Sequence, residues 1–214
     1  MASIEGLYAG RVESLELGGE PSVTAIRKRP VTTAQVGALG VEGDEQADRN
    51  SHGGPDMALC VYPAEHYPMW ERRFGRPLQV PAFGENLRVA GRLEDDVALG
   101  EVWLIGEVRL QVAQPRVPCR MPATLNGEPR LTSWMCQSGA TGYLLRVLQG
   151  GAIAVGAAVE VVERPASRLT VAELNRLRYV DTDDGPGLRR ALAADTLTAT
   201  WRARLENQLA RVAG

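Results

Sequence analysis

One cysteine, Cys119, stands in the part of the sequence best suited to chemistry. It lies between two arginines, Arg116 and Arg120, directly after an apolar run. Arginine stays protonated at any working pH, so two guanidinium groups nearby favour the thiolate, which is the form that attacks carbon or binds a metal. Pro115 and Pro118 fix the backbone and lack N–H donors, so we expect Cys119 on a stiff irregular loop. The alternative is that Cys119 only packs as a small apolar side chain in a loop, and the flanking charges are less consistent with that role.

Two glycine-dense segments, 40–44 and 51–56, precede an apolar strand-like run. Glycines let backbone N–H groups approach a ligand closely, and adjacent N–H groups in such turns form nests that bind phosphate. An ordinary pair of tight turns explains the same residues equally well. His52 lies in the second segment, where it is a candidate to donate to an anionic ligand or to move protons near neutral pH.

A loop at 83–87 adds an amide and a carboxylate. Asn86 offers one donor and one acceptor, the pattern needed to read the edge of a pterin or purine. Glu85 is expected to lock a neighbouring arginine. His66 is expected to satisfy a structural hydrogen bond, and it is too far from His52 in sequence for a helical i, i+4 zinc pair.

Composition sets the class of protein. A chain of 214 residues with 44% hydrophobic residues fits one medium domain, or one domain with a small appendage. The formal net charge of −2 and the sequence pI near 5.8 give no global reason to expect nucleic-acid or membrane binding. No apolar segment approaches the ~20 residues that span a bilayer, so a cytoplasmic location is expected. Lys28 is the one lysine among 24 basic residues, which sets it apart from the many arginines.

The cysteine pattern restricts the redox chemistry. Cys60, Cys119 and Cys136 are odd in number and have no C-x-x-C spacing. This pattern argues against a disulfide framework, a structural zinc site and a bound iron–sulfur cluster. Electrons, where they are needed, must therefore come from another protein. We expect Cys60 and Cys136 to be replaceable with little effect.

Short apolar runs separated by glycine or proline predict a mainly β fold, a barrel or a sandwich. Gly106-Glu107 has the length of a hairpin turn between two of these runs. Helices are expected at 64–74 and 131–137. The strands are expected at 7–12, 58–62, 97–105, 108–113 and 158–162.

The pattern becomes helical after residue 164. Thr170 and Glu173 have the spacing of a capping box, and the stretch 181–187 is expected to be a turn. Apolar residues then recur at helical spacing up to Val212, which predicts an amphipathic last helix. Its apolar stripe is expected to pack on the chain's own barrel, with docking of a partner as the alternative.

Taken together, these strings resemble the MOSC family, the molybdenum cofactor sulfurase C-terminal-like domains, and within it the small stand-alone bacterial branch. The resemblance covers roughly residues 5 to 164, and the remainder resembles the three-helix appendage of that branch. It divides the chain into a barrel domain at 1–164 and an appendage at 165–214. The strings that carry it are 24–31, 40–44, 52–56, 62–70, 83–87, 114–119 and 142–147.

The resemblance implies a closed or nearly closed β-barrel in which Cys119 coordinates the molybdenum of a pterin-dithiolene cofactor. A soft thiolate suits such a centre, and local cations and N–H groups would meet the cofactor's phosphate. The residues implied for these contacts are Lys28, His52, Asn86 and Arg116. The chain departs from the family pattern at Glu101 and Ala157, where aspartate is usual, and at Arg120, where lysine is usual.

The function implied is an oxidoreductase that reduces N-hydroxylated compounds, hydroxylaminopurine-like bases among them, to amines. Cys119 would fix the metal, Lys28 and Arg116 would hold the anionic cofactor, and His52 would donate a proton. A separate flavin or iron–sulfur reductase would supply the electrons. The alternative is sulfur transfer through a Cys119 persulfide, loaded by a desulfurase. A third reading is a cofactor carrier without turnover.

Overall fold

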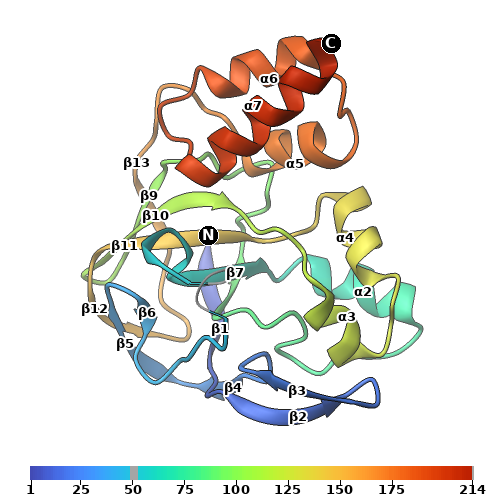
Figure 1. Ribbon diagram of the computed structural model, residues 1–214. Helices are drawn as coiled ribbons and strands as arrows, with labels where there is room; N and C mark the ends of the chain where they lie inside the picture. Colours follow the sequence, from blue (N-terminus) through green and yellow to red (C-terminus); the bar gives the residue numbers. More distant parts are fainter. Residues whose placement is uncertain (49–52, 214) are drawn as a thin grey trace.

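A strongly curled sheet of eight strands forms the body of the computed structural model, which describes residues 1–48 and 53–213 (Figure 1). All neighbouring strands are antiparallel except β7 and β8, which are parallel. In spatial order the strands are β13 (Glu160–Glu163), β9 (Val102–Ile105), β10 (Val108–Pro115), β11 (Tyr143–Gln149), β7 (Leu59–Pro63), β8 (Leu87–Ala90), β1 (Ser3–Ala9) and β4 (Arg29–Val31).

The sheet nearly closes on itself at the start of β1. The N–H of Ile4 donates to Ala157 O at 3.0 Å, and the N–H of Val159 donates to Ala2 O at 3.0 Å. These bonds join β1 to the segment that leads into β13, the opposite edge of the sheet. The predicted mainly β fold with a nearly closed barrel is therefore confirmed.

Two smaller sheets extend the barrel. One is formed by β12 (Gly151–Ala154), β5 (Thr33–Gly37) and β6 (Gly40–Val41), and the other by β2 (Glu13–Leu17) and β3 (Glu20–Thr24). The sequence analysis did not predict these strands, because they are short and carry few β-branched residues in alternation. The Gly106-Glu107 turn is confirmed, since Ile105 pairs with Val108 across it.

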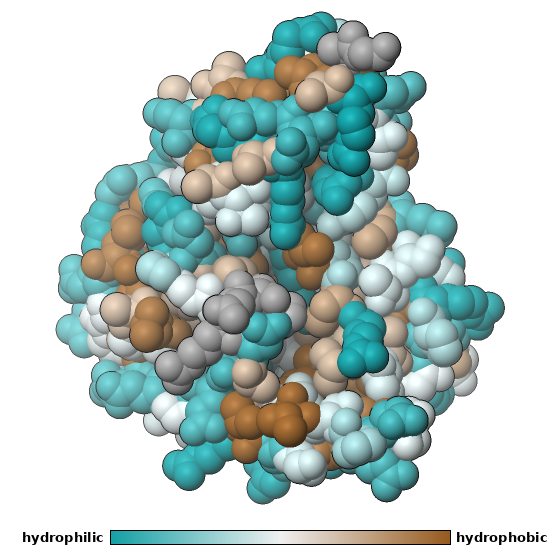
Figure 2. Space-filling model, in the orientation of Figure 1, coloured by the Kyte–Doolittle hydropathy of each residue, from teal (hydrophilic) through white to brown (hydrophobic). Residues whose placement is uncertain are grey.

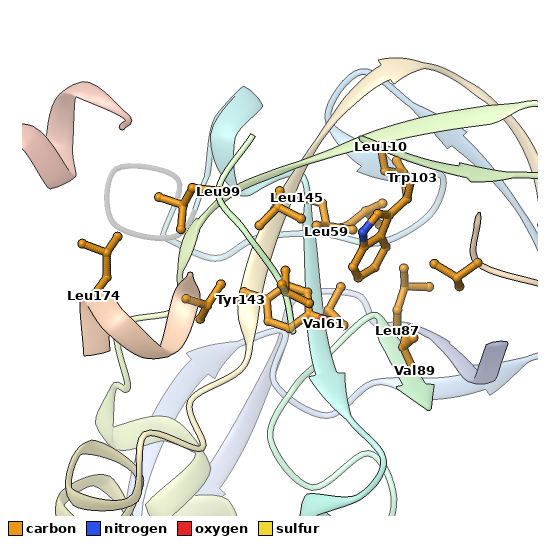
Figure 3. Packing of buried hydrophobic residues seen from close by; sticks show 14 of the residues in the cluster. Leu59, Val61, Leu87, Val89, Leu99, Trp103, Leu110, Tyr143, Leu145 and Leu174 are labelled. Atoms are coloured by element: carbon orange, nitrogen blue, oxygen red, sulfur yellow. The ribbon is translucent and has the colours of Figure 1, made fainter. Parts of the chain in front are cut away.

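Alternation along the strands builds the main core. Leu59 and Val61 of β7 point to the same side as Leu87 and Val89 of β8, because successive side chains of a strand face opposite ways (Figure 3). The predicted strand at 97–105 is shorter in the structure and begins at Val102. Gly100, with φ +86°, turns the chain just before it.

Helices cover one end of the barrel. The predicted helices correspond to α2 (His66–Phe74) and α4 (Leu131–Ser138), while α3 (Arg120–Asn126) was not predicted. Helix α3 is short and follows a proline-rich segment, so its sequence carries no helical repeat. A 3-10 turn, η1 (Pro55–Met57), precedes β7. A second apolar cluster around Trp70 and Phe83 lies beneath these helices.

The C-terminal part consists of α5 (Val171–Tyr179), α6 (Gly185–Leu192) and α7 (Ala199–Ala213). The predicted capping box is present, because Thr170 Oγ1 accepts from the N–H of Glu173 at 3.0 Å. The stretch 181–187, predicted as a turn, already contains the start of α6. Asp184 caps that helix by accepting from the N–H of Gly187 at 2.8 Å, and Pro186 suits its first turn.

These helices form a lobe that stands on the barrel, with polar side chains over much of its visible face (Figures 1 and 2). Leu174 and Trp201 are fully buried in the same apolar cluster as Leu99 of the barrel. Thr198 Oγ1 also donates to Gln114 Oε1 of β10 at 2.8 Å in the buried contact. The tail therefore packs on its own barrel, as the stripe predicted. Within the described residues, no helix is long and apolar enough to cross a membrane.

Candidate functional site

Cys119 lies where the sequence predicted, on an irregular segment. Residues 116–119 connect β10 to α3, and Cys119 has extended backbone angles of φ −109° and ψ 172° just before the helix. Its carbonyl oxygen accepts from Thr132 Oγ1 of α4 at 3.2 Å. The strand on one side and two helices on the other therefore hold the cysteine at the end of the barrel.

Arg116 is buried three residues before the cysteine, with 9% of its surface exposed. Its Nη2 donates to Phe83 O at 2.6 Å, while its Nη1 is buried and has no hydrogen-bond partner among the described residues. Burial alone would lower the pKa of this guanidinium. Cys60, Cys119 and other nearby acidic groups outweigh that effect and raise its pKa. Arg116 therefore stays charged and keeps a donor for an incoming acceptor.

Cys60, which the sequence analysis treated as replaceable, lies next to Asn86 of the predicted site. Burial raises the pKa of its thiol, and the positive charges of Arg116 and Lys28 act in the opposite direction. Glu85 and Cys119 raise it further. Hydrogen bonds between Cys60 and Asn86, at 3.1 Å and 2.8 Å, show that β7 brings Cys60 next to one of the predicted residues. Only the strand pairing reveals this position.

Lys28 forms an ion pair with Asp44, and both side chains are largely buried. Asp44 Oδ1 also accepts from the N–H of Gly10 at 2.8 Å, and its Oδ2 accepts from Asn86 Nδ2 at 2.8 Å. A Cβ on Gly10 would lie 3.1 Å from the backbone atoms Lys28 Cα and Ala25 O, so any side chain there would require this tight packing to shift. Asp44 thus ties the lysine, the first strand and the 83–87 loop together.

Asn86 is 4% exposed, and the protein itself uses its amide group. Its Nδ2 donates to Tyr8 O at 3.3 Å as well as to Asp44, and its Oδ1 accepts from the N–H of Cys60 at 3.1 Å. In this arrangement Asn86 positions Asp44 and Cys60. The contact with a cofactor expected from the sequence stays a prediction.

Glu85 differs from its expected role. It is fully buried and accepts from the O–H of Tyr67 and from the N–H of Phe83, the latter at 3.0 Å, so it does not lock an arginine by a hydrogen bond. Burial raises the pKa of this carboxyl group, and Arg116 opposes that change through space. His66 has the structural hydrogen bond expected of it, since its Nε2 lies 2.7 Å from Glu94 Oε2.

A cavity of about 430 Å³ lies beside the Lys28–Asp44 pair. Arg11, Arg27 and Arg29 line it together with Glu13, so the positive charges outnumber the negative one. Such a cavity suits an anionic group, for which arginine offers fixed pairs of N–H donors. The sequence analysis missed these residues because arginine is abundant throughout the chain. Arg27 and Arg29 could have been identified from the sequence, because they stand directly before and after the one lysine.

His52, the predicted proton donor and cofactor contact, lies outside the described residues. In the parts of the chain that the structure describes, no cluster of three or more histidine, cysteine, aspartate and glutamate side chains could hold a metal ion. The structure therefore brings together Lys28, Asn86, Arg116 and Cys119 of the predicted site and adds Cys60, Asp44 and the arginine-lined cavity.

The fold and the site define a nearly closed β-barrel domain that presents a cysteine beside a buried arginine and carries a separate helical lobe. Residues 48–160 match the model of the MOSC domain, and residues 169–211 match the model described as the YiiM-like 3-alpha helix domain. The chain belongs to the MOSC domain family. It combines the MOSC domain with the helical domain found in YiiM-like proteins.

Known proteins resemble the chain over nearly its whole length. YflK of Bacillus subtilis is 42% identical over 94% of this chain and 91% of its own length. The crystal structure of YiiM from Geobacillus stearothermophilus superposes with a TM-score of 0.83 at 34% identity, covering 98% of this chain and all of the other. A Gibberella moniliformis protein named Reductase is 32% identical over 79% of this chain, which spans only 31% of that longer protein.

Proposed function

We propose that this protein is a molybdenum-cofactor-dependent oxidoreductase that reduces N-hydroxylated compounds, hydroxylaminopurine-like bases among them, to amines. Membership of the MOSC family and the likeness to a fungal protein named Reductase support an oxidoreductase role related to this cofactor. The observation that carries the proposal is the buried Nη1 of Arg116, a charged donor that lacks an acceptor among the described residues and lies close to Cys119.

The residues present fit the cofactor. The sulfur of Cys119 is a soft ligand suited to molybdenum, and Arg116 can donate to the anionic cofactor beside it. The arginine-lined cavity, with Lys28 behind it, would hold the terminal phosphate. When bound, the cofactor supplies a metal centre that can accept oxygen and pass two electrons.

The proposed reaction requires a source of electrons, a proton donor and residues that hold the cofactor. R–NHOH takes up two electrons and two protons and yields R–NH₂ and water as the N–O bond breaks. The electrons come from a separate flavin or iron–sulfur reductase. His52 is the proposed proton donor, because imidazole exchanges protons near neutral pH. Arg116 and Lys28 would hold the anionic cofactor in place.

Sulfur transfer is the second candidate, and one observation favours it: Cys119 acts electrostatically on the thiol of Cys60, so a second cysteine is in the neighbourhood of the first. The raised pKa of Cys60 opposes that role, because a thiol that stays protonated is a poor acceptor of sulfur at neutral pH. The same property suits a neutral neighbour of a metal ligand. The cofactor enzyme is therefore the function that the geometry supports best.

The first test measures molybdenum and pterin in protein purified from molybdenum-replete cells. We expect about one of each per chain in the wild type and neither in Cys119→Ala. Cys136→Ala is the matched control, because Cys136 lies on α4 outside the site, and this variant should retain both. Stoichiometric molybdenum in Cys119→Ala would overturn the ligand assignment. A persulfide on Cys119 without molybdenum would favour sulfur transfer.

The second test measures turnover of the loaded protein. Reduced methyl viologen serves as electron donor, an aromatic hydroxylamine as substrate, and the amine is quantified by chromatography. We expect amine formation that depends on Cys119. Loaded protein that yields no amine would identify a cofactor carrier and contradict the reductase assignment.

A further inference from the structure

We propose that an acidic electron-transfer protein docks on a surface formed by the end of α2, by α3 and by α4. This arginine–tryptophan surface comprises residues 71–79 and 120–138, and the three helices lie together at one side of the barrel (Figure 1). The inference rests on the proposed function, because it assigns the face on which the separate electron donor binds.

The surface lies next to Cys119. Helix α3 begins at Arg120, directly after the cysteine, and Thr132 Oγ1 of α4 donates to Cys119 O at 3.2 Å. At the other end of α3, Arg76 Nη2 donates to Asn126 O at 2.7 Å and so joins the segment after α2 to this helix. The seven residues of α3 span about 10 Å. A protein bound over these helices would therefore be held close to the cysteine.

The charge of this surface is opposite to that of the whole chain. It carries five arginines and two glutamates, whereas the full chain has a formal net charge of −2. Glu128 accepts two hydrogen bonds from Arg130, at 2.8 Å and 2.9 Å. Glu71 accepts from the N–H of Leu78 at 3.2 Å. The other four arginines are exposed and form no ion pair with the described residues; they are Arg72, Arg73, Arg76 and Arg120.

Trp134 adds a fixed aromatic contact. Its side chain is half-buried on α4, and the guanidinium carbons of Arg73 and Arg130 lie 4.0 Å and 4.7 Å from the centre of its ring. Phe74 meets the ring edge-on, with the two ring centres 6.1 Å apart. Tryptophan and arginine are the residues that most often dominate the binding energy of an interface, and a ring already held by its neighbours loses little freedom on binding. The surface thus combines a fixed contact with unpaired positive charge.

An acidic protein fits this surface better than a nucleic acid. Proteins that bind a phosphate backbone tightly contact about six to ten phosphates, and four unpaired arginines are too few for that. Electron donors instead form small, transient complexes that are steered by complementary charge. The β2–β3 hairpin sets one border, because a Cβ on Gly18 would lie 3.3 Å from Thr124 of α3. Glu16 and Glu20 flank this turn and would direct an acidic partner away from the hairpin, toward α2 and α4.

The docked protein supplies the electrons that the reduction consumes. A one-electron donor must bind twice in each turnover. Two reduced ferredoxins, two protons and one R–NHOH then give two oxidised ferredoxins, one R–NH₂ and one water. A surface used twice in each turnover needs rapid release, which favours contacts made by exposed charges.

The first experiment measures binding and does not depend on turnover. The full-length protein is titrated at low salt with an acidic plant-type 2Fe–2S ferredoxin and with a flavodoxin, by biolayer interferometry. We expect at least one of them to bind, and the double substitution Arg72→Gln and Arg73→Gln to weaken that binding at least about fivefold. Arg189→Gln with Arg211→Gln is the matched control, because both are exposed arginines of the helical lobe; it should change binding less than about twofold. Binding of neither protein, or equal losses in the two double variants, would overturn the proposal.

Trp134→Leu separates a defined contact from the general field of the surface. It should weaken binding about threefold to tenfold at both about 0.05 M and about 0.15 M salt, because an apolar contact is not screened. The loss caused by the double arginine substitution should shrink as salt is added. Unchanged binding by Trp134→Leu would contradict the contact at the tryptophan. A single-stranded DNA oligonucleotide that binds as tightly as the acidic proteins would contradict a protein as the occupant.

Turnover distinguishes failure of this inference from failure of the proposed function. Amine formation is followed with the acidic donor, kept reduced by NADPH and a ferredoxin reductase, and with reduced methyl viologen. The double substitution at Arg72 and Arg73 should lower the protein-driven rate at least about fivefold and leave the viologen-driven rate unchanged, because a small cation needs no acidic docking face. Equal losses with both donors would overturn the docking surface. Absence of amine with either donor in the wild type would contradict the reductase, and the binding measurements would then decide for or against the surface.

Discussion

Arg92 and Arg116 are both buried guanidinium groups, but their surroundings differ. Nη2 of Arg92 donates to Glu101 Oε1 at 2.6 Å, and the carboxylate of Glu101 is fully buried. Trp103 Nε1 donates to the same oxygen at 2.7 Å. Arg116 instead donates to one backbone carbonyl, and Cys60, Cys119 and Glu85 act on its charge through space.

The two arginines differ in their counter-charge. A buried charge needs a counter-charge, and Glu101 provides it for Arg92 inside the barrel. Among the described residues, no carboxylate is hydrogen-bonded to Arg116, and the buried carboxyl group of Glu85 acts on it only through space. A charge kept in this state favours an external anion. Glu101, which stands where the family usually has aspartate, thus supplies the buried counter-charge of Arg92.

Removal of the counter-charge of Arg92 should have the largest effect. Glu101→Gln keeps the shape of the side chain but leaves a buried cation unpaired, so the free energy of unfolding should fall by about 3–5 kcal/mol. Urea denaturation measures this change. Glu163→Gln removes the exposed partner of Arg109 and should change it by less than about 1 kcal/mol. Equal effects of the two substitutions would remove the distinction between the two arginines.

Removal of the unpaired charge should affect binding more than folding. Arg116→Met loses one hydrogen bond to Phe83 but also removes a desolvated cation, so the free energy of unfolding should fall by only about 1–2 kcal/mol. Molybdenum retained after dialysis should fall at least about tenfold, because a charge-assisted contact is lost. Destabilisation as large as that of Glu101→Gln would assign Arg116 a structural role. Full retention of molybdenum would exclude it from the cofactor site.

The smallest effect concerns the pH dependence of stability at Glu85. Burial raises the pKa of this carboxyl group above its ordinary value of 4.5, so the folded state binds more protons than the unfolded state. The contribution of Glu85 to stability is therefore fully present below that ordinary value and is lost as the pH rises through the raised one. Glu85→Gln should remove this decline. Urea midpoints between about pH 4 and about pH 8 test it, and parallel profiles for both proteins would show that Glu85 does not cause it.

The secondary structure could largely be predicted where the signal for an element lies within a few neighbouring residues. The hairpin at Gly106-Glu107, the ends of α2 and α4 and the cap at Thr170 depend on residues close together in the sequence. Elements with weak local patterns were missed, as β5, β12 and α3 show. The start of α6 was hidden because aspartate, glycine and proline suit both a turn and a helix N-terminus.

The sequence by itself determined the charged setting of Cys119, the mainly β fold, the separate helical end and the family resemblance, because each rests on residue types and spacings along the chain. Only the tertiary structure decided that Cys60 and Asp44 belong to the site and that Asn86 and Glu85 bind protein groups. It also decided which buried arginine is paired. The physical reason is that strand pairing joins distant residues such as Cys60 and Asn86, and burial then sets the charge and hydrogen-bonding needs of each group.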